Sequence, residues 1–400
     1  MKLAHRVQVM KPSSTLKVTA MVKQLTAEGH DIIGFGAGEP DFDTPQRIKD
    51  TVGRALSQGL TKYEPVGGTP AALKAVAAYV GPKLGRELAP QNVLISCGGK
   101  HSLYLAFMAL VEPGDEVLIP APYWVSYPEQ ARLAGAEVVE IPGSVDNDFK
   151  ITPEQLRQAL TPRSKVLVIN SPSNPTGTMY SPAELKALAE VVVEHPQLLV
   201  FADDIYERLV YGPDPFVSFA SLHPALWERT VTFNCLSKSY AMTGWRVGFA
   251  VAPAECIKAM AALQGQMTSN ITSFVYPAIV EALQGPQDEV EAMRQAFAQR
   301  GQLMHRLLSS MPGIKCCQPT GAFYVFPDIA EAAFGKVDPA GKRIETAADF
   351  AESLLTHARV AVVPGEDFSG PRHVRLSFAT SNAKIEAGLE RLAQFLEKLA

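Results

Sequence analysis

Three absences limit what this chain of 400 residues can be. Positive charge is not in excess, since 37 lysines and arginines stand against 41 acidic residues and give a net charge of −4. Nucleic-acid and membrane-surface partners are therefore not expected, because both require a basic face. No apolar run is long enough to span a bilayer, and the first residues lack the apolar core of a signal peptide. We expect a cytoplasmic protein.

Cysteine is also scarce, and its placement argues against two further classes. The count of five is odd, and the spacing fits neither a disulfide framework nor a zinc site. We expect free thiols in a reducing compartment and no metal centre. The cysteines are Cys97, Cys235, Cys256, Cys316 and Cys317.

The remaining composition is that of an ordinary globular protein, with 47% hydrophobic and 20% charged residues. A chain this long exceeds what one hydrophobic core serves, so two domains are expected. From about residue 90 to 252, short apolar runs alternate with helical patterns, which predicts an α/β fold with a mostly parallel sheet. The runs cover residues 93–96, 116–120, 137–141, 165–170, 198–202, 230–234 and 247–252.

The pattern changes after about residue 286. The elements expected there are a long charged helix, three short strands and a closing amphipathic helix, at residues 288–310, 322–326, 360–363, 374–378 and 385–399. The first forty residues show no strong period and are expected to wrap onto another surface. We therefore expect a large α/β domain over residues 48–285, and a smaller α+β domain formed by residues 1–47 and 286–400.

Polar groups gather where the apolar runs end, which in an α/β sheet is where ligands bind. Run 93–96 is followed by Cys97 and then by Gly98, Gly99 and Lys100, at the start of a helix. Such a turn offers backbone N–H groups to an anion, although a plain tight turn fits equally well. Run 116–120 is followed by Trp124, which by itself would be taken as a core residue.

Three further run ends continue the series. Asn174 lies in a proline-rich turn after run 165–170. Asp203 and Asp204 follow run 198–202; one can face solvent, but the strand period sends the other inward, where it needs a cation or several donors. Lys238, between two serines, follows run 230–234. A solvated loop would explain that lysine alone, but it would not explain five apolar runs that each end at a polar or aromatic site residue.

One ligand that needs all these groups is pyridoxal phosphate. Its phosphate suits a glycine-rich helix start together with a hydroxyl and an arginine, here Ser237 and Arg246. Its ring stacks on an aromatic side chain, and its pyridine nitrogen stays protonated beside a buried aspartate. Its aldehyde condenses with a lysine whose pKa is lowered by burial and by neighbouring cations.

The sequence also resembles the class I aminotransferases, fold-type I pyridoxal-phosphate enzymes, in their bacterial aspartate aminotransferase branch. The matching stretches are GAGEPDFDTP, KYEPVGG, GGKHSL, PYWVSYPE, NSPSNPTG, DDIYE, SKSYAMTGWRVG and HVRLSFATS, and they span nearly the whole chain. The resemblance implies that Lys238 holds the cofactor and shuttles the proton, and that Asp203 pairs with the ring nitrogen. It further implies that Asn174 and Tyr206 bind the ring oxygen and that Trp124 stacks on the ring.

The same resemblance implies a phosphate site and a second subunit. The phosphate-binding residues would be Gly99, Lys100, Ser237 and Arg246, the first two through their backbone. Tyr63 would reach the phosphate of the neighbouring subunit's cofactor, so a homodimer is expected.

A substrate site is implied as well. Arg375 would clamp the substrate α-carboxylate as a bidentate pair, assisted by the Gly38 backbone, Trp124 and Asn174. Strand periodicity alone would place Arg375 on the surface.

One departure concerns substrate choice. The animal-type aspartate enzymes bind the distal carboxylate with an arginine near the segment that corresponds to residues 266–270, and no arginine stands there. We expect Lys100 and Lys11 to replace it, with solvent exposure as the alternative for both. The expected reaction transfers an amino group between L-aspartate or L-glutamate and 2-oxo acids. Alternatives are prephenate or another acidic substrate, a pyridoxal-phosphate lyase, or a ligand-sensing regulator, although no basic DNA-binding extension is present.

Overall fold

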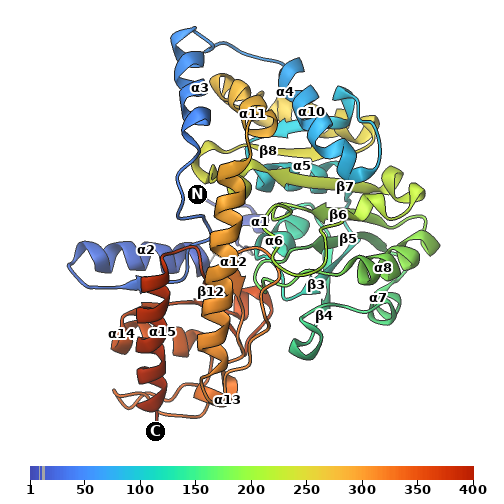
Figure 1. Ribbon diagram of the computed structural model, residues 1–400. Helices are drawn as coiled ribbons and strands as arrows, with labels where there is room; N and C mark the ends of the chain where they lie inside the picture. Colours follow the sequence, from blue (N-terminus) through green and yellow to red (C-terminus); the bar gives the residue numbers. More distant parts are fainter. Residues whose placement is uncertain (9, 11–13) are drawn as a thin grey trace.

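The computed structural model describes residues 1–8, 10 and 14–400. Within these residues, a central seven-stranded sheet has the order β2-β8-β7-β6-β5-β3-β4 (Figure 1). Its strands are β2 (Val93–Ser96), β3 (Glu116–Ala121), β4 (Glu137–Pro142), β5 (Ser164–Asn170), β6 (Leu199–Asp203), β7 (Thr230–Cys235) and β8 (Gly248–Val251). Each strand coincides with one of the predicted apolar runs. The α/β fold with a mostly parallel sheet is confirmed.

Only β8 runs against the direction of its neighbours in this sheet, as far as the described chain shows. The connection from β7 to β8, residues 236–247, contains only the short helix α9 (Leu236–Ser239) and a 3₁₀ turn. A crossover to a parallel strand usually needs a full helix, so the chain folds back antiparallel. This return places Lys238 and Arg246 at the same edge of the sheet.

The sheet is buried on both faces. Val166 and Val168 of β5 belong to one hydrophobic core, whereas Leu167 and Ile169 belong to another on the opposite face. Because both faces are covered, the strands appear in the sequence as continuous apolar runs. The surrounding helices are α3 (Gln46–Ser57), α4 (Pro70–Val80), α5 (Gly99–Leu110), α6 (Ser126–Leu133), α7 (Pro153–Ala159), α8 (Pro182–Glu194), α10 (Ala254–Met267) and α11 (Tyr276–Gln284).

A separate core lies outside this sheet, where the C-terminal residues gather with Ile33 and Phe35. Among the described residues, β1 (Ile33–Gly34) pairs with β10 (Val360–Ala361), and β11 (Val363–Pro364), β12 (Val374–Ser377) and β9 (Tyr324–Val325) form a three-stranded sheet. The helices are α1 (His5–Gln8), α2 (Ser14–Ala27), α12 (Asp288–Ser309), α13 (Ala330–Ala333), α14 (Ala347–Ala358) and α15 (Asn382–Glu397). The long helix α12 reaches from beside the central sheet down to α13 (Figure 1).

Two details differ from the sequence-based expectations. The strand expected at residues 360–363 is divided into β10 and β11, because Ala361 pairs with β1 while Val363 pairs with Arg375 of β12. Residues 14–27, for which no element was expected, form α2. The domain limits at residues 47/48 and 285/286 remain a prediction. No helix in the described ranges is long and apolar enough to cross a membrane.

Candidate active site

A cavity of about 340 Å³ opens at the carboxyl ends of the sheet strands, between the sheet and the C-terminal core. Its volume is within the range of small-molecule sites. The predicted site residues that line it are Gly38, Lys100, Trp124, Asn174, Asp203, Tyr206, Lys238 and Arg375. Residues far apart in the sequence therefore meet here, as expected from the polar residues at the ends of the apolar runs.

Lys238 lies in α9, directly after β7, and is partly buried. Its Nζ donates a hydrogen bond to the carbonyl of Gly38, 2.5 Å away, although 200 positions separate the two residues. This contact holds the loop around Gly38 against the amine. Lys238 is therefore a cavity lysine and not a residue of a solvated loop.

Asp203 ends β6 and is 4% exposed. Its Oδ2 accepts a hydrogen bond of 2.6 Å from the Tyr127 hydroxyl. Burial raises the pKa of Asp203 to about 6, against the opposing effects of the hydrogen bond from Tyr127, the Ile205 N–H and the charge of Lys238. A carboxylate in this position favours a cation placed in the cavity.

Asp204 points to the other side of the sheet but does not reach solvent, since it is 7% exposed. Its Oδ2 accepts a hydrogen bond of 2.7 Å from Ser218, which precedes the 3₁₀ turn Phe219–Ser221. Burial raises the pKa of Asp204 as well. The suggestion that one of the two carboxylates faces solvent is therefore wrong, because the chain after β6 covers Asp204.

Two polar residues of the site were not identified from the sequence. Tyr127 follows Trp124 by three positions, and their rings meet edge-on at 5.3 Å. Trp124 lies before α6 begins, and the Tyr127 N–H donates to the Trp124 carbonyl (3.1 Å), so a turn at the start of the helix brings the two rings together. Asn170, at the end of β5, donates to the Asp203 carbonyl (3.0 Å) and accepts from the Asn174 N–H (2.9 Å). Asn170 therefore ties the ends of β5 and β6 together.

Arg375 is 2% exposed and not a surface residue, because distant parts of the chain cover its side chain. Its Nη1 donates to Asn174 Oδ1 (2.9 Å) and its Nη2 to the Gly36 carbonyl (3.1 Å). Within the described chain its buried Nε has no hydrogen-bond partner, and the neighbouring groups whose charge acts on Arg375 are Tyr324 and Tyr206, not a carboxylate. Burial lowers the pKa of Arg375. A buried guanidinium without a counter-charge is unfavourable, so the site suits an anionic ligand.

A second anion site is formed where α5 begins. Gly98 precedes the helix with φ +89°, and a Cβ there would lie 2.5 Å from Nη2 of Arg246. Because Gly98 has a positive φ and no side chain, the guanidinium has room beside the first helical N–H groups, which include that of Gly99. Ser237 is buried in the neighbouring α9. A helix N-terminus, an arginine and a serine hydroxyl together fit a phosphate.

Lys100 lies between the two anion sites. Its Nζ lies 4.9 Å from the centre of the Trp124 ring. Its pKa is lowered, chiefly by burial and further by the charges of Arg246 and Lys238. Tyr63 is 91% exposed in the single chain, and Lys11 lies outside the described residues.

Comparison with known proteins decides the family. Residues 30–392 match the family model described as aminotransferase class I and II. The chain belongs to this family. This aminotransferase is 50% identical over 400 residues to an aspartate aminotransferase of Geobacillus stearothermophilus, with 100% of each chain covered. It is 44% identical to an aspartate/prephenate aminotransferase of Cereibacter sphaeroides, with 98% of each covered.

A solved structure of aspartate aminotransferase from Thermus thermophilus with maleate is similar to this aminotransferase throughout. The TM-score is 0.92 at 42% identity, and the match covers 99% of this chain and 100% of the other. The expected family and fold type are therefore confirmed. In the part of this aminotransferase that the structure describes, no group of three His, Cys, Asp or Glu residues is placed to hold a metal ion.

Proposed function

We propose that this aminotransferase uses pyridoxal phosphate to transfer the amino group between L-aspartate or L-glutamate and 2-oxo acids. The observation that carries the proposal is the meeting of Asp203, Lys238 and the uncompensated Arg375 in one cavity. The relatives named above, which are aspartate aminotransferases along their whole length, support it.

The residues present fit the cofactor at both of its ends. The buried carboxylate of Asp203 suits the protonated ring nitrogen. The Arg246 guanidinium beside the first N–H groups of α5 suits the phosphate. The phosphate would be held by Gly99 and Lys100 through their backbone, and by Ser237 and Arg246. When bound, pyridoxal phosphate supplies an electron sink for the electrons released from the substrate Cα.

The ring would be held by three further side chains of the cavity. Trp124 would stack on one face, with its position fixed by the edge-on contact with Tyr127. Asn174 and Tyr206 would donate to the ring oxygen. Burial raises the pKa of Tyr206 well above its usual range, so its hydroxyl keeps its proton.

Lys238 has two proposed tasks, which follow from its position. Its Nζ would hold the cofactor covalently, and with substrate bound it would act as the base that takes the proton from the substrate Cα. Arg375 binds the substrate α-carboxylate, with Asn174 and the Gly38 backbone beside it. The donor pair of Arg375 thereby directs the Cα–H bond toward Lys238.

Recognition of the distal carboxylate is proposed for Lys100, with Lys11 as a second candidate. Lys100 lines the cavity with its side chain exposed in the single chain, and no carboxylate among the described residues acts on its charge. A charge-assisted contact contributes roughly 1.5–3 kcal/mol, and 1.36 kcal/mol corresponds to about tenfold in rate. Lys100→Ala should therefore lower kcat/KM for aspartate by about one to two powers of ten and spare alanine or an aromatic donor. If both donor types fall in parallel, Lys100 serves only the cofactor.

A homodimer is proposed to complete the site through Tyr63. The 91% exposure of this side chain accompanies exposed apolar residues at Leu60 and Met267, which favours burial by a second copy. Molecular mass in solution tests the assembly. Tyr63→Phe should weaken cofactor retention without changing the mass. The cytoplasmic location and the domain limits at residues 48–285 remain predictions.

One experiment tests the proposed reaction as a whole. Purified enzyme is supplied with a panel of amino donors and with 2-oxoglutarate, oxaloacetate or prephenate as acceptor. Aspartate with 2-oxoglutarate should give oxaloacetate and glutamate. Prephenate remains a second candidate acceptor, since relatives named for it are about as similar as several named for aspartate alone. An eliminated fragment in place of a new amino acid would instead indicate a lyase.

A further inference from the structure

Tyr324 of β9 lies beside Tyr206 and Arg375, and it is neither a proposed cofactor ligand nor a proposed substrate ligand. It is 1% exposed, and it lines the cavity. Its hydroxyl lies 3.1 Å from the Tyr206 hydroxyl, and its ring centre lies 4.6 Å from Cζ of Arg375. One side chain therefore contacts a proposed cofactor ligand and the proposed substrate clamp.

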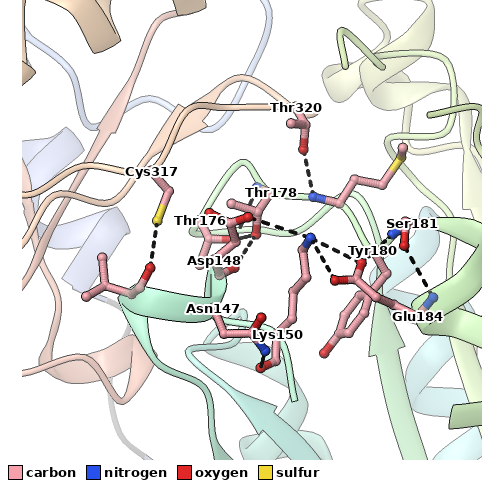
Figure 2. A network of polar contacts seen from close by, with 12 residues as sticks. Asn147, Asp148, Lys150, Thr176, Thr178, Tyr180, Ser181, Glu184, Cys317 and Thr320 are labelled. Atoms are coloured by element: carbon pink, nitrogen blue, oxygen red, sulfur yellow. Dashed lines mark hydrogen bonds and ion pairs between the residues drawn. The ribbon is translucent and has the colours of Figure 1, made fainter. Parts of the chain in front are cut away.

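The backbone around Tyr324 is held closely by the turn that carries Asn174. A Cβ on Gly177 would lie 2.0 Å from the Tyr324 carbonyl oxygen, so the two chain segments are in direct contact. The N–H groups of Thr320 and Gly321 donate to the Gly177 carbonyl at 2.8 and 2.9 Å. The Thr320 hydroxyl accepts from the Met179 N–H at 2.9 Å, as Figure 2 shows. These contacts with the turn that carries Asn174 thus hold the backbone of Tyr324 in place.

The tip of the Tyr324 side chain is also confined. A Cβ on Gly38 would lie 3.3 Å from the Tyr324 hydroxyl, which is closer than most such contacts. The absence of a side chain at Gly38 therefore leaves the space that the phenol occupies. Gly38 also accepts from Lys238, so the same short loop limits both side chains.

The pair of phenols has a direction. Each hydroxyl has one proton, so in a contact of 3.1 Å one hydroxyl donates and the other accepts. If Tyr206 donates to the cofactor ring oxygen, Tyr324 must donate to Tyr206. A hydrogen bond received by Tyr206 polarises its O–H bond and makes it a stronger donor.

The ring of Tyr324 has a separate role. The guanidinium of Arg375 contacts two aromatic rings, since its Cζ lies 4.6 Å from the centre of the Tyr324 ring and 5.0 Å from that of the Phe368 ring. Attraction between a cation and an aromatic face increases when water is excluded. The two rings therefore fix the plane of a guanidinium whose Nε forms no hydrogen bond in the described chain.

We propose that Tyr324 is a positioning residue with two separable contributions: its hydroxyl orients and polarises Tyr206, and its ring holds the plane of Arg375. The inference rests on the proposed function. Because Tyr324 contacts both Tyr206 and Arg375, the same side chain aligns the cofactor half and the substrate half of the site.

Two substitutions separate the contributions. Tyr324→Phe keeps the ring and removes the hydroxyl, whereas Tyr324→Leu removes both. The first readout is the pKa of the bound-cofactor chromophore, from absorbance against pH in the holoenzyme. The second is the Kd of succinate, a dicarboxylate that cannot react. Tyr180→Phe is the matched control, because the buried Tyr180 hydroxyl accepts from Ile151 N–H outside the cavity.

Loss of the Tyr324 hydroxyl should change the first readout, the pKa of the bound-cofactor chromophore. Weaker donation from Tyr206 leaves the ring oxygen more basic, so the chromophore should keep its proton to higher pH. The expected rise is about 0.4 to 1 pH unit for both Tyr324 variants. In a Tyr206→Phe background, Tyr324→Phe should add no further rise, because the residue through which it acts is gone. A rise that persists in that background, or no rise with Tyr206 intact, overturns this part.

Loss of the Tyr324 ring should change the second readout, the Kd of succinate. Tyr324→Phe should leave the Kd of succinate within about twofold, while Tyr324→Leu should raise it about three- to thirtyfold. Tyr180→Phe should change neither readout. Equal succinate binding by Tyr324→Leu and the wild-type enzyme overturns this part. If the wild-type protein does not take up pyridoxal phosphate, the proposed function fails first and the inference fails with it.

Discussion

Replacing Asp203 by Asn should have opposite effects on the cofactor-free and the cofactor-loaded protein. Asn has the same shape, and its Oδ1 can still accept the hydrogen bond that the Tyr127 hydroxyl donates to Asp203. The substitution therefore removes a negative charge and little else. In the loaded enzyme that charge is proposed to face the ring nitrogen. In the cofactor-free protein it faces a cavity that contains no cation in direct contact with it among the described residues.

The size of the effect follows from the pKa of Asp203, which burial raises from 3.8 to about 6. Below pH 4 the group is protonated in the folded and the unfolded chain, and it has no effect on stability. Between pH 4 and 6 the folded chain holds more protons than the unfolded chain, so stability falls as pH rises. Above pH 6 the loss is complete, at about 1.36 kcal/mol for each of roughly two pKa units, or about 3 kcal/mol.

The cofactor-free Asp203→Asn variant should therefore be the more stable protein at pH 8. For a chain of this length the gain corresponds to a melting temperature about 3 °C higher, and about half of it should remain at pH 5. In the loaded enzyme, loss of one partner of a buried charge pair costs about 3–5 kcal/mol. At 1.36 kcal/mol for each tenfold, kcat/KM should fall by about two to four powers of ten.

Scanning calorimetry of the cofactor-free protein from pH 5 to 8 and steady-state kinetics of the loaded enzyme measure the two effects. Asp204→Asn is the control, because Asp204 is equally buried and its pKa is also raised, but it faces Ser218 and not the cavity. That variant should gain stability at pH 8 and keep its activity within about twofold of the wild type. Equal losses of activity in both variants, or a less stable cofactor-free Asp203→Asn variant at pH 8, would refute the reasoning.

Two further predictions concern Lys238 and Gly177. Borohydride reduction and peptide mapping should place the cofactor label on the peptide that contains Lys238, and Lys238→Ala should lower turnover by several powers of ten; a label on Lys100 would contradict the assignment. Gly177→Ala should lower the melting temperature much more than Gly85→Ala, since both glycines have a positive φ, but only a Cβ on Gly177 meets backbone, at 2.0 Å. Equal decreases would show that the contact with Tyr324 can relax.

The central sheet could be predicted because its strands are buried on both faces. Most of its strands are continuous apolar runs, and polar residues mark the point where a run ends, whereas the edge strand β4 contains Glu137 and Glu140 and is largely exposed. Lys238 and Asp203 follow directly from that pattern, and the structure places both in the cavity. The antiparallel direction of β8 was not predicted, since it depends on the length of the connection and not on the strand itself.

Burial by distant parts of the chain accounts for what the pattern missed. Arg375 lies in a strand whose alternation suggests a surface residue, and its side chain is enclosed by distant parts of the chain, among them Gly36 and Asn174. Asp204 is covered by the chain around Ser218, which no local period reveals. Tyr324 could not be singled out because an aromatic residue in an apolar run is indistinguishable from core. Its role depends on Tyr206, 118 positions away.

The position of Arg375 along the chain has a consequence for synthesis. The side chains proposed to hold the cofactor, from Gly99 to Arg246, leave the ribosome well before Arg375, whose contact with the Gly36 carbonyl joins residues 339 positions apart. During synthesis, the proposed cofactor-binding residues of the chain are therefore present before the proposed carboxylate clamp is made. A chain whose synthesis stops before residue 375 would lack the proposed carboxylate clamp even where its proposed cofactor-binding residues are folded.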